Sequence, residues 1–454
     1  MKKTKIAALL AAAQPVYADN NIDALVPELW AMESLLQLEK LSVMPWLVHR
    51  DFESAVANFG DTVNAHLPAD FKLTRKGVND DVETQDATAA TVPVKLDQHL
   101  VVSFVIKDGQ ESKAFKDLIS TFLEPAMRTI SEGIDKMLAG QVFNFVENSV
   151  GAAGTAAGAD SLPDLKALMT NNRVPGSGRN NVLSANTEAA LTKLDLFIGA
   201  DKVGDDGSAL REGSLGRKYG ASNVTDIAIP SLKGGTAGLA KTVNFGAGYV
   251  EGYTGSIVLD SATAHAAYSV VEIAGSVYTV TSGGATAVVL DQPLKAALAD
   301  GATINQVADG TIGAAYAIGY EKGILITGIR GAVGEAIRTA TGEIYSIVEA
   351  TGVADTYLLD RPLAVALSNA QKVGVFPDGD YNFSFHSNAL ALVTRPLAAP
   401  KTGSGAISAV VNENGVGVRV VITYDGKAQG HRVTIDLLAG IKVLNTKLGA
   451  VLLS

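Results

Sequence analysis

The sequence contains no cysteine, which excludes disulfides, thiol catalysis and cysteine-ligated zinc or iron–sulfur centres. It has no surplus of basic residues either: Lys and Arg total 37, Asp and Glu total 47, and the formal net charge is −10. A protein that clamps nucleic acid needs a cationic surface to displace counterions, so this charge balance argues against a nucleic-acid-binding module. No stretch approaches the roughly 20 consecutive apolar residues of a membrane-spanning helix.

Aromatic residues are scarce as well, at 6%, whereas glycine is abundant, with 46 residues among 454. This composition favours turn-rich β-structure over a helical bundle. With 47% hydrophobic and 19% charged residues, the chain is of the globular class. Its length predicts two to three domains, whose stability must come from burial and backbone hydrogen bonding.

The N-terminal segment 1–18 has features of a secretory signal. Three lysines precede an apolar run at 6–13, and Val16–Ala18 resembles a cleavage site. The apolar run is at the short end for such a signal, and we therefore interpret the segment as part of an N-terminal arm. The alternative is a secreted β-rich surface or binding protein.

A long amphipathic helix is predicted from Lys113 to Ser149, because apolar residues recur there at spacings of three and four. At about 1.5 Å per residue it would be a rod of roughly 55 Å. Pro125 predicts a kink or a joint near Glu124. A rod of this length is typical of a structural brace. The alternative is two ordinary core helices of an α/β enzyme.

The segment from Lys72 to Asp86 has its charges separated by sign and too little apolar surface to form a core. It is interpreted either as a solvated loop or as a surface that contacts a partner; the acidic part could also bind a hard cation, which we favour least. The candidate contact residues are Lys72, Arg75, Lys76, Asp80, Asp81, Glu83 and Asp86.

Other elements are predicted from periodicity and turn signals. A helix is expected from Val26 to Lys40, capped by Asp23, with an apolar face of Leu25, Leu29, Trp30, Met32 and Leu36. Further helices are expected at 162–169, 187–197, 210–219 and 387–393, and strands at 92–96, 99–106, 224–229, 417–424 and 433–438, with a hairpin turn at Asp425–Gly426. The apolar C-terminus, 448–453, must be docked against the rest of the chain.

An internal repeat occupies the region from 246 to 376. Gly252–Tyr253 recurs as Gly319–Tyr320, and the sequence Leu-Asp-Gln-Pro-Leu at 290–294 recurs as Leu-Asp-Arg-Pro-Leu at 359–363. The two pairs have nearly the same offset along the sequence, which indicates two small β-rich modules in tandem, at 246–312 and 313–376. Two copies are too few for a solenoid, so we interpret them as an insertion carried by a host domain.

Catalytic signatures are missing. The sequence has no phosphate-binding Gly-x-x-x-x-Gly-Lys-Ser/Thr loop, no Gly-x-Ser-x-Gly elbow and no His-Glu-x-x-His motif. The six histidines are far apart in the sequence. We therefore expect no enzyme activity, no cofactor and no metal site.

The order of the parts resembles the major capsid proteins of tailed bacteriophages, the Hong Kong 97-type fold, and within them the group that carries an inserted domain. Five segments carry this resemblance: 24–30 with 47–51 and 60–63 (N-terminal arm), 113–149 (spine helix), 210–220 (axial helix and turn), 386–396 (return helix) and 436–444 with 448–449 (closing strand).

The resemblance implies an α+β fold with an N-arm, an extended loop, a peripheral domain with a long spine helix, an axial domain and a β-rich insertion. The implied boundaries are 1–60 for the arm and first helix, 61–110 for the extended loop, 111–150 with 401–454 for the peripheral domain, 151–245 with 377–400 for the axial domain, and 246–376 for the insertion.

The resemblance also implies a function: self-assembly into an icosahedral shell around double-stranded DNA, with maturation from a procapsid. The implied partners are many copies of the chain in hexamers and pentamers, a scaffolding protein, a portal protein and a decoration protein. The shell would be assembled in the host cytoplasm and form part of the virion, with no membrane association. The net negative charge suits a container that encloses DNA without binding it specifically.

Overall fold

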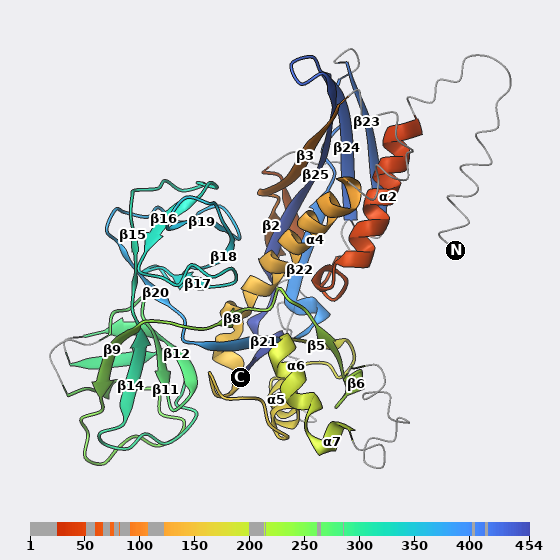
Figure 1. Ribbon diagram of the computed structural model, residues 1–454. Coiled ribbons are helices and arrows are strands. Elements are labelled where there is room, and N and C mark those ends of the chain that lie inside the picture. The colour runs from red at the N-terminus through yellow and green to blue at the C-terminus, as the bar shows by residue number, and fades with distance from the viewer. Residues whose placement is uncertain are drawn as a thin grey trace, which may run out of the picture.

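The computed structural model describes residues 25–50, 60–66, 73–76, 81, 91–107, 122–198, 213, 215–260, 265–284, 286–401, 405–413 and 416–454. The chain is a mixture of helices and sheets. Figure 1 shows a long sheet with two helices along it, a smaller sheet-and-helix body at one end of it, and two β-modules beside them.

The long sheet is built on β25 (Gly430–Val443). On one side of β25 lies β3 (Gln98–Lys107); on the other side lie β24 (Val416–Asp425) and β22 (Leu390–Arg395), which pair with successive parts of β25, and β23 (Ala406–Glu413) lies beyond β24. All pairs are antiparallel, and β24 and β25 form the expected hairpin. The strands predicted at 99–106, 417–424 and 433–438 are therefore confirmed.

Two helices, α2 (Leu25–Leu41) and α4 (Glu124–Ala139), cover one face of this sheet (Figure 1). The helix predicted at 26–40 is confirmed. Of its predicted apolar face, Trp30 is buried, but Leu29, Met32 and Leu36 are only partly so; among the side chains that the structure describes, the buried ones are Trp30, Ala31, Ser34, Leu35 and Leu38. Trp30 packs against Phe104 of β3, with ring centroids 6.0 Å apart. The side of α2 that carries Trp30 therefore faces the sheet.

The brace consists of α4 followed directly by a 3₁₀ helix, η4 (Gly140–Asn148). One buried stripe runs through both: Met127, Ile130, Ile134, Leu138, Val142, Phe145 and Val146. The helix prediction is thus correct from 124 to 148, whereas 113–121 lies outside the described residues. Pro125 falls in the first turn of α4, where a proline lacks only an N–H that has no helical partner.

The second sheet has the order β4 (Ser149–Gly151), β26 (Gly449–Leu453), β21 (Gly379–His386), β5 (Arg179–Leu183), β7 (Ala221–Thr225) and β6 (Arg217–Lys218), with β8 (Ser231–Leu232) pairing with β21. Helices α5 (Ser161–Asn171), α6 (Ala185–Thr192) and α7 (Asp195–Ile198) belong to the same body. The C-terminal strand β26 lies inside this sheet and all of its residues are buried, so the prediction of a docked C-terminus is confirmed.

Four sequence predictions are corrected. The helix expected at 187–197 is two helices, α6 and α7. The helix expected at 210–219 is wrong where the structure describes it, because Arg217–Lys218 is a strand; the strand expected at 224–229 is β7, which ends at Thr225. The return helix expected at 387–393 is a short 3₁₀ turn, η5 (Ser387–Ala389), followed by β22. All β22 residues are buried, and a strand buried on both faces has a continuous apolar run that also fits a helix.

A two-stranded sheet pairs β1 (Thr62–His66) with β2 (Thr91–Lys95). Val94 of β2 is buried with Leu96 against Ala391 and Val393 of β22. The strand predicted at 92–96 is confirmed, and the β1–β2 sheet is attached to the long sheet at its β22 end.

The repeated region forms two six-stranded modules. The first contains β9 (Ala237–Thr242), β10 (Ile257–Val258), β11 (Val270–Ile273), β12 (Ser276–Gly283), β13 (Ala287–Leu290) and β14 (Thr303–Val307), in the order β10-β13-β12-β11-β14-β9. The second contains β15 (Gly310–Ile312), β16 (Ile324–Thr327), β17 (Ala336–Arg338), β18 (Ile344–Ala350), β19 (Thr356–Leu359) and β20 (Lys372–Val375), closed as the barrel β15-β16-β19-β18-β17-β20. Corresponding strands follow in the same order, and β9 places the start of the first module before residue 246.

The repeated residues make the same hydrogen bonds in both modules. Asp291 accepts a bond from the Thr279 amide (3.0 Å), and Asp360 accepts one from the Ser346 amide (3.1 Å). Likewise the Tyr278 hydroxyl oxygen accepts from the Lys295 amide, and the Tyr345 hydroxyl oxygen from the Ala364 amide. Asp291 and Asp360, and likewise Tyr278 and Tyr345, therefore have structural roles. They hold the segment that follows β13 to β12 in the first module, and the segment that follows β19 to β18 in the second.

Candidate assembly surfaces

The charged segment predicted from the sequence is described only in part. Arg75, Lys76 and Asp81 are exposed, and Leu73 beside them is 94% exposed. Lys72, Asp80, Glu83 and Asp86 lie outside the described residues. The structure therefore presents a short exposed segment, 73–76, which combines one large apolar side chain with two cationic ones.

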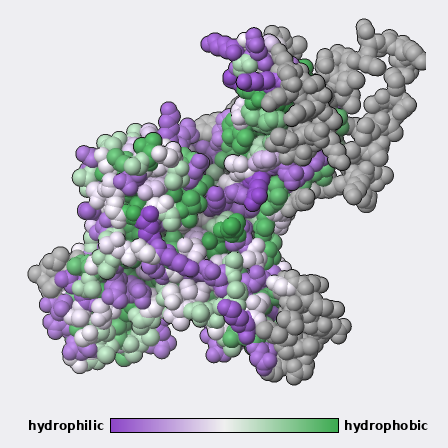
Figure 2. All heavy atoms as spheres, in the orientation of Figure 1, coloured by the Kyte–Doolittle hydropathy of each residue, from purple (hydrophilic) through white to green (hydrophobic). Residues whose placement is uncertain are grey.

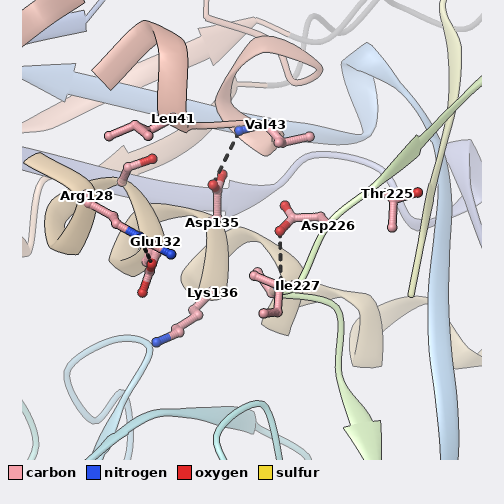
Figure 3. A pocket seen from close by; sticks show the side chains of 11 residues that line it. Leu41, Val43, Arg128, Glu132, Asp135, Lys136, Thr225, Asp226 and Ile227 are labelled. Atoms are coloured by element: carbon pink, nitrogen blue, oxygen red, sulfur yellow. Dashed lines mark hydrogen bonds and ion pairs between the residues drawn. The ribbon is translucent and has the colours of Figure 1, made fainter. Parts of the chain in front are cut away.

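An acidic pocket lies between α4, the end of α2 and the loop after β7. It is a cavity of about 290 Å³ whose lining includes Ser131, Glu132, Asp135, Asp226 and Ile227. Asp135 accepts hydrogen bonds from the backbone amides of Met44 (3.0 Å) and Val43 (3.3 Å). Figure 3 shows the Asp226 carboxylate directed from its loop toward the α4 residue Asp135. The pocket thus brings together two carboxylates that are far apart in the sequence.

Both carboxyl groups of this pocket are buried, which disfavours their charged forms. Burial, reinforced by the negative charge of Asp226, raises the pKa of Asp135 to about 7 against the bonds from Val43 and Met44. Burial likewise raises the pKa of Asp226, and the hydrogen bond from the Ala228 amide (2.9 Å) only partly offsets it. The sequence analysis missed this pair. The available signal was Asp135 itself, a carboxylate inside the apolar stripe of the brace.

Asp378 joins the chain segments that enter and leave the two modules. Its carboxylate accepts bonds from the Gly234 and Gly235 amides (both 3.0 Å), which belong to the segment that enters the modules. Arg330 of the second module donates to the same carboxylate and also pairs with the fully buried Glu335. One carboxylate therefore ties the entering segment, the leaving segment and the second module together.

Both modules also contact the brace through equivalent turns. Gln141 of η4 donates to the buried Asp360 of the second module at 2.7 Å. Lys295 of the first module donates to the Ser149 carbonyl at 3.0 Å. A Cβ on Gly140 would clash with the Ser346 side chain, so glycine permits the close approach of β18 to the brace.

The face of the long sheet opposite the helices carries a row of residues across four strands. Arg419 of β24 pairs with the buried Asp436 of β25 at 2.8 Å, and in register beside them lie the exposed Val410 of β23 and Val101 of β3. Among the described strands, β23 is the last on its side of the sheet. Exposed apolar side chains next to an edge strand are typical of a surface that contacts another chain.

A hollow separates the second module from the long sheet (Figure 2). It is a cavity of about 680 Å³, lined by residues that include Lys95, Asp97, Ile318, Arg361 and Lys442. Figure 2 also shows hydrophilic and hydrophobic residues interspersed over the visible face of the modules. Within the described part of the chain, no group of three or more His, Asp or Glu side chains is arranged to hold a metal ion, and no described helix is long and apolar enough to cross a bilayer.

No protein family model matches the sequence, and no curated protein matches it. Solved structures do match over most of the chain. They include a structure of Mycobacterium phage Che8 (14% identity, TM-score 0.41, 90% of this chain and 90% of that one), the capsid of cyanophage P-SCSP1u (12%, 0.40, 89% and 90%) and the mature capsid of bacteriophage PhiM1 (7%, 0.39, 91% and 86%).

The latter two are phage capsids, the class of structure that the sequence resemblance named. Identities of 7% to 14% with TM-scores of 0.39 to 0.41 are too low to transfer a function. The function is therefore argued below from the chain's own elements.

Proposed function

We propose that this protein is the major capsid protein of a tailed bacteriophage. Many copies, in hexamers and pentamers, form an icosahedral shell that encloses double-stranded DNA, and the protein's place is in the virion. The role is structural and not catalytic. In the proposal, residues 61–110 are the extended loop, α4 and η4 the spine, and the modules an insertion into the axial domain.

The observation that carries the proposal is the chain order of the elements. The N-terminal helix α2 and the strands β1, β2 and β3 precede the brace, and a second body follows it. The chain then returns from the modules to complete both sheets with β21, β22, β25 and β26. Three surfaces of this chain are suited to contact with a partner: the exposed segment 73–76, the edge of the long sheet at β23, and the acidic pocket. A shell subunit needs several such surfaces, because it contacts many identical copies.

The finer parts of the proposal follow from the same reading. Assembly would use a scaffolding protein and a portal protein, with a decoration protein on the finished shell, and the brace and arm would shift when the procapsid matures. The charged residues Lys72, Arg75, Lys76, Asp80, Asp81, Glu83 and Asp86 would contact neighbouring subunits, where complementary charges fix the register. The alternative of a secreted binding protein is not favoured, since both modules are fixed to the brace by buried contacts.

Sedimentation velocity of the purified full-length chain over a range of concentrations tests the proposal. We expect a 46.9 kDa species at low concentration and, above a threshold, a single very large species, as for a closed shell. Small oligomers alone, at every concentration and with or without added scaffolding protein, would refute the assignment.

A further inference from the structure

Two buried oxygen atoms in the acidic pocket have no hydrogen-bond partner in the described structure. They are Oδ2 of Asp226 and Oγ of Ser131, and the two residues are 6% and 1% exposed. Buried polar atoms are nearly always satisfied in native structures, so a carboxylate oxygen without a donor indicates a missing partner. Both residues line the same cavity as Asp135, and the Asp226 oxygen needs a group that donates a hydrogen bond.

The cations already near the pocket do not supply this group. Arg128 is largely exposed and is engaged with Glu132, one turn along α4, at 2.9 Å. Figure 3 shows the Lys136 side chain extending away from Asp135 and Asp226. Among the described residues, no cation therefore pairs with Asp135 or Asp226, and a cationic group with several donors would complement both.

An apolar contact point stands beside this pocket. Ile227, adjacent to Asp226, is 92% exposed, and Leu73 of the arm segment is 94% exposed; these are the two most exposed large apolar side chains among the described residues. Leu73 is followed by the cations Arg75 and Lys76, whereas Ile227 borders a pocket with more carboxyl groups than cations in its lining. The two surfaces are complementary both in charge and in hydrophobicity.

The spacing selects one of the two basic residues. In an extended segment, residues two apart lie on the same face, roughly 6.6 Å from each other. Docked as an extended strand, the segment would present Leu73 and Arg75 on one face and Lys76 on the opposite one. A guanidinium carries five donors and suits a site with several unpaired oxygens.

We propose that the segment 73–76 of one copy docks on the acidic pocket of a second copy, with the Arg75 guanidinium between Asp135 and Asp226 and Leu73 against Ile227. This inference rests on the proposed function and names the surface that receives the arm. It also explains why a desolvated pair of carboxylates is retained between the brace and the second body: the pair is completed only in the assembly.

Assembly of three single variants and one double variant, followed by light scattering, tests this contact. Arg75→Gln and Asp226→Asn should each raise the concentration for half-maximal assembly by about tenfold or more, the range for a charge-assisted hydrogen bond repeated at many interfaces. In Asp226→Asn the new side-chain carbonyl can still accept the Ala228 amide bond, so the local fold is kept. Lys76→Gln is the matched control, with the same charge loss on the other face and an expected change of less than twofold. The Arg75→Gln/Asp226→Asn double variant should be no worse than either single variant.

Cysteine crosslinking tests the apolar half of the contact, and the absence of native cysteine makes it unambiguous. A Leu73→Cys chain and an Ile227→Cys chain of different tag length are mixed, assembled and oxidised. We expect a disulfide-linked heterodimer as the main product, which can form only between copies. A Lys76→Cys chain in place of Leu73→Cys should give much less.

The outcomes separate this inference from the proposed function. If the wild-type chain never forms particles, the proposed function fails. If particles form and Arg75→Gln and Asp226→Asn assemble like the wild type, or no heterodimer appears, the docking inference fails and the capsid role stands. If Asp226→Asn impairs assembly, Arg75→Gln does not and a chelator reproduces the defect, the pocket holds a metal ion and the docking inference is overturned.

Discussion

Single carboxylates hold this chain together at positions where separate parts meet. Asp135 joins the brace to the turn after α2, Asp360 joins the second module to η4, and Asp378 joins the two ends of the insertion. Each is polar inside or beside an apolar environment, so each contributes by accepting several hydrogen bonds at once. Asp360 belongs to the repeated Leu-Asp-Arg-Pro-Leu segment, whereas Asp135 and Asp378 belong to no recognised sequence motif; the contacts of all three appear only when distant segments are brought together.

Asp135 should make stability depend on pH. Its carboxyl has an ordinary pKa of 3.8 and a pKa of about 7 in the folded chain. Between these values the folded chain binds more protons than the unfolded one, so its stability falls as pH rises from 4 to 7, and the cost is fully present above pH 7. Asp135→Asn should therefore raise the free energy of unfolding at pH 8 by on the order of 2 kcal/mol, with little gain near pH 4.

Denaturant unfolding of dilute, unassembled protein at pH 4.5, 6 and 8 measures this effect. Asp160→Asn, at an exposed carboxylate of the second body, is the control and should leave the pH profile unchanged. A wild-type stability that is flat or rises over this range, and is unaltered by Asp135→Asn, would contradict the assignment.

Asp378 should govern how firmly the modules are held. Asp378→Ala removes the acceptor of two backbone amides and one partner of Arg330, and we expect a loss of about 1–3 kcal/mol for the hydrogen-bond group. Because the loss is local, it should show as faster proteolysis near residues 233–236 with the modules themselves intact. Glu251→Ala, at an exposed position of the first module, should be cleaved at the wild-type rate; equal rates for Asp378→Ala would refute the clamp.

At the scale of elements, the brace is defined by its glycines as much as by its apolar stripe. Gly140 stands where α4 changes to η4 and where Ser346 of β18 comes close, whereas Gly133, in the middle of α4, has open space beside its Cα. Glycine therefore has opposite effects on stability at these two positions. At Gly133 it weakens the helix, and at Gly140 it leaves room for Ser346 of the second module.

Alanine substitutions should separate the two glycines. Gly133→Ala is expected to stabilise the chain by roughly 0.5–1 kcal/mol, the difference in helix propensity. Gly140→Ala is expected to destabilise it by about 1–3 kcal/mol, because the new methyl group overlaps Ser346. Thermal unfolding of both variants measures the two shifts, and a Gly140→Ala variant that is as stable as the wild type or more stable would show that β18 does not press on the brace.

The elements also show what the sequence can predict. Alternation over 417–424 and 433–438 with an Asp-Gly turn predicts a hairpin because period and turn chemistry agree. The error at 387–393 has the opposite origin: Leu390, Leu392 and Val393 fit a helix and a doubly buried strand equally well, and only pairing with β25 decides between them. The face of α2 was misjudged because spacing treats Trp30 as one apolar residue among several, although its size determines the packing.

At the scale of the whole molecule, the two tandem modules could be predicted and the contacts between distant segments could not. The repeat was visible because each copy reuses the same aspartate and tyrosine for the same turn. The acidic pocket was not, because Asp135 and Asp226 are far apart in the sequence and are joined only by the fold. The predicted contact residues in the arm include Arg75, but its proposed acceptor could come only from the structure.

The central claim is that copies of this chain assemble into a closed shell. Electron microscopy of the purified full-length protein tests this claim most directly. We expect closed particles of uniform diameter, built from rings of five and six subunits, with the paired modules visible as repeated protrusions on the lattice. Fields that contain only separate single subunits or small oligomers, under conditions that include high protein concentration and added scaffolding protein, would contradict the account.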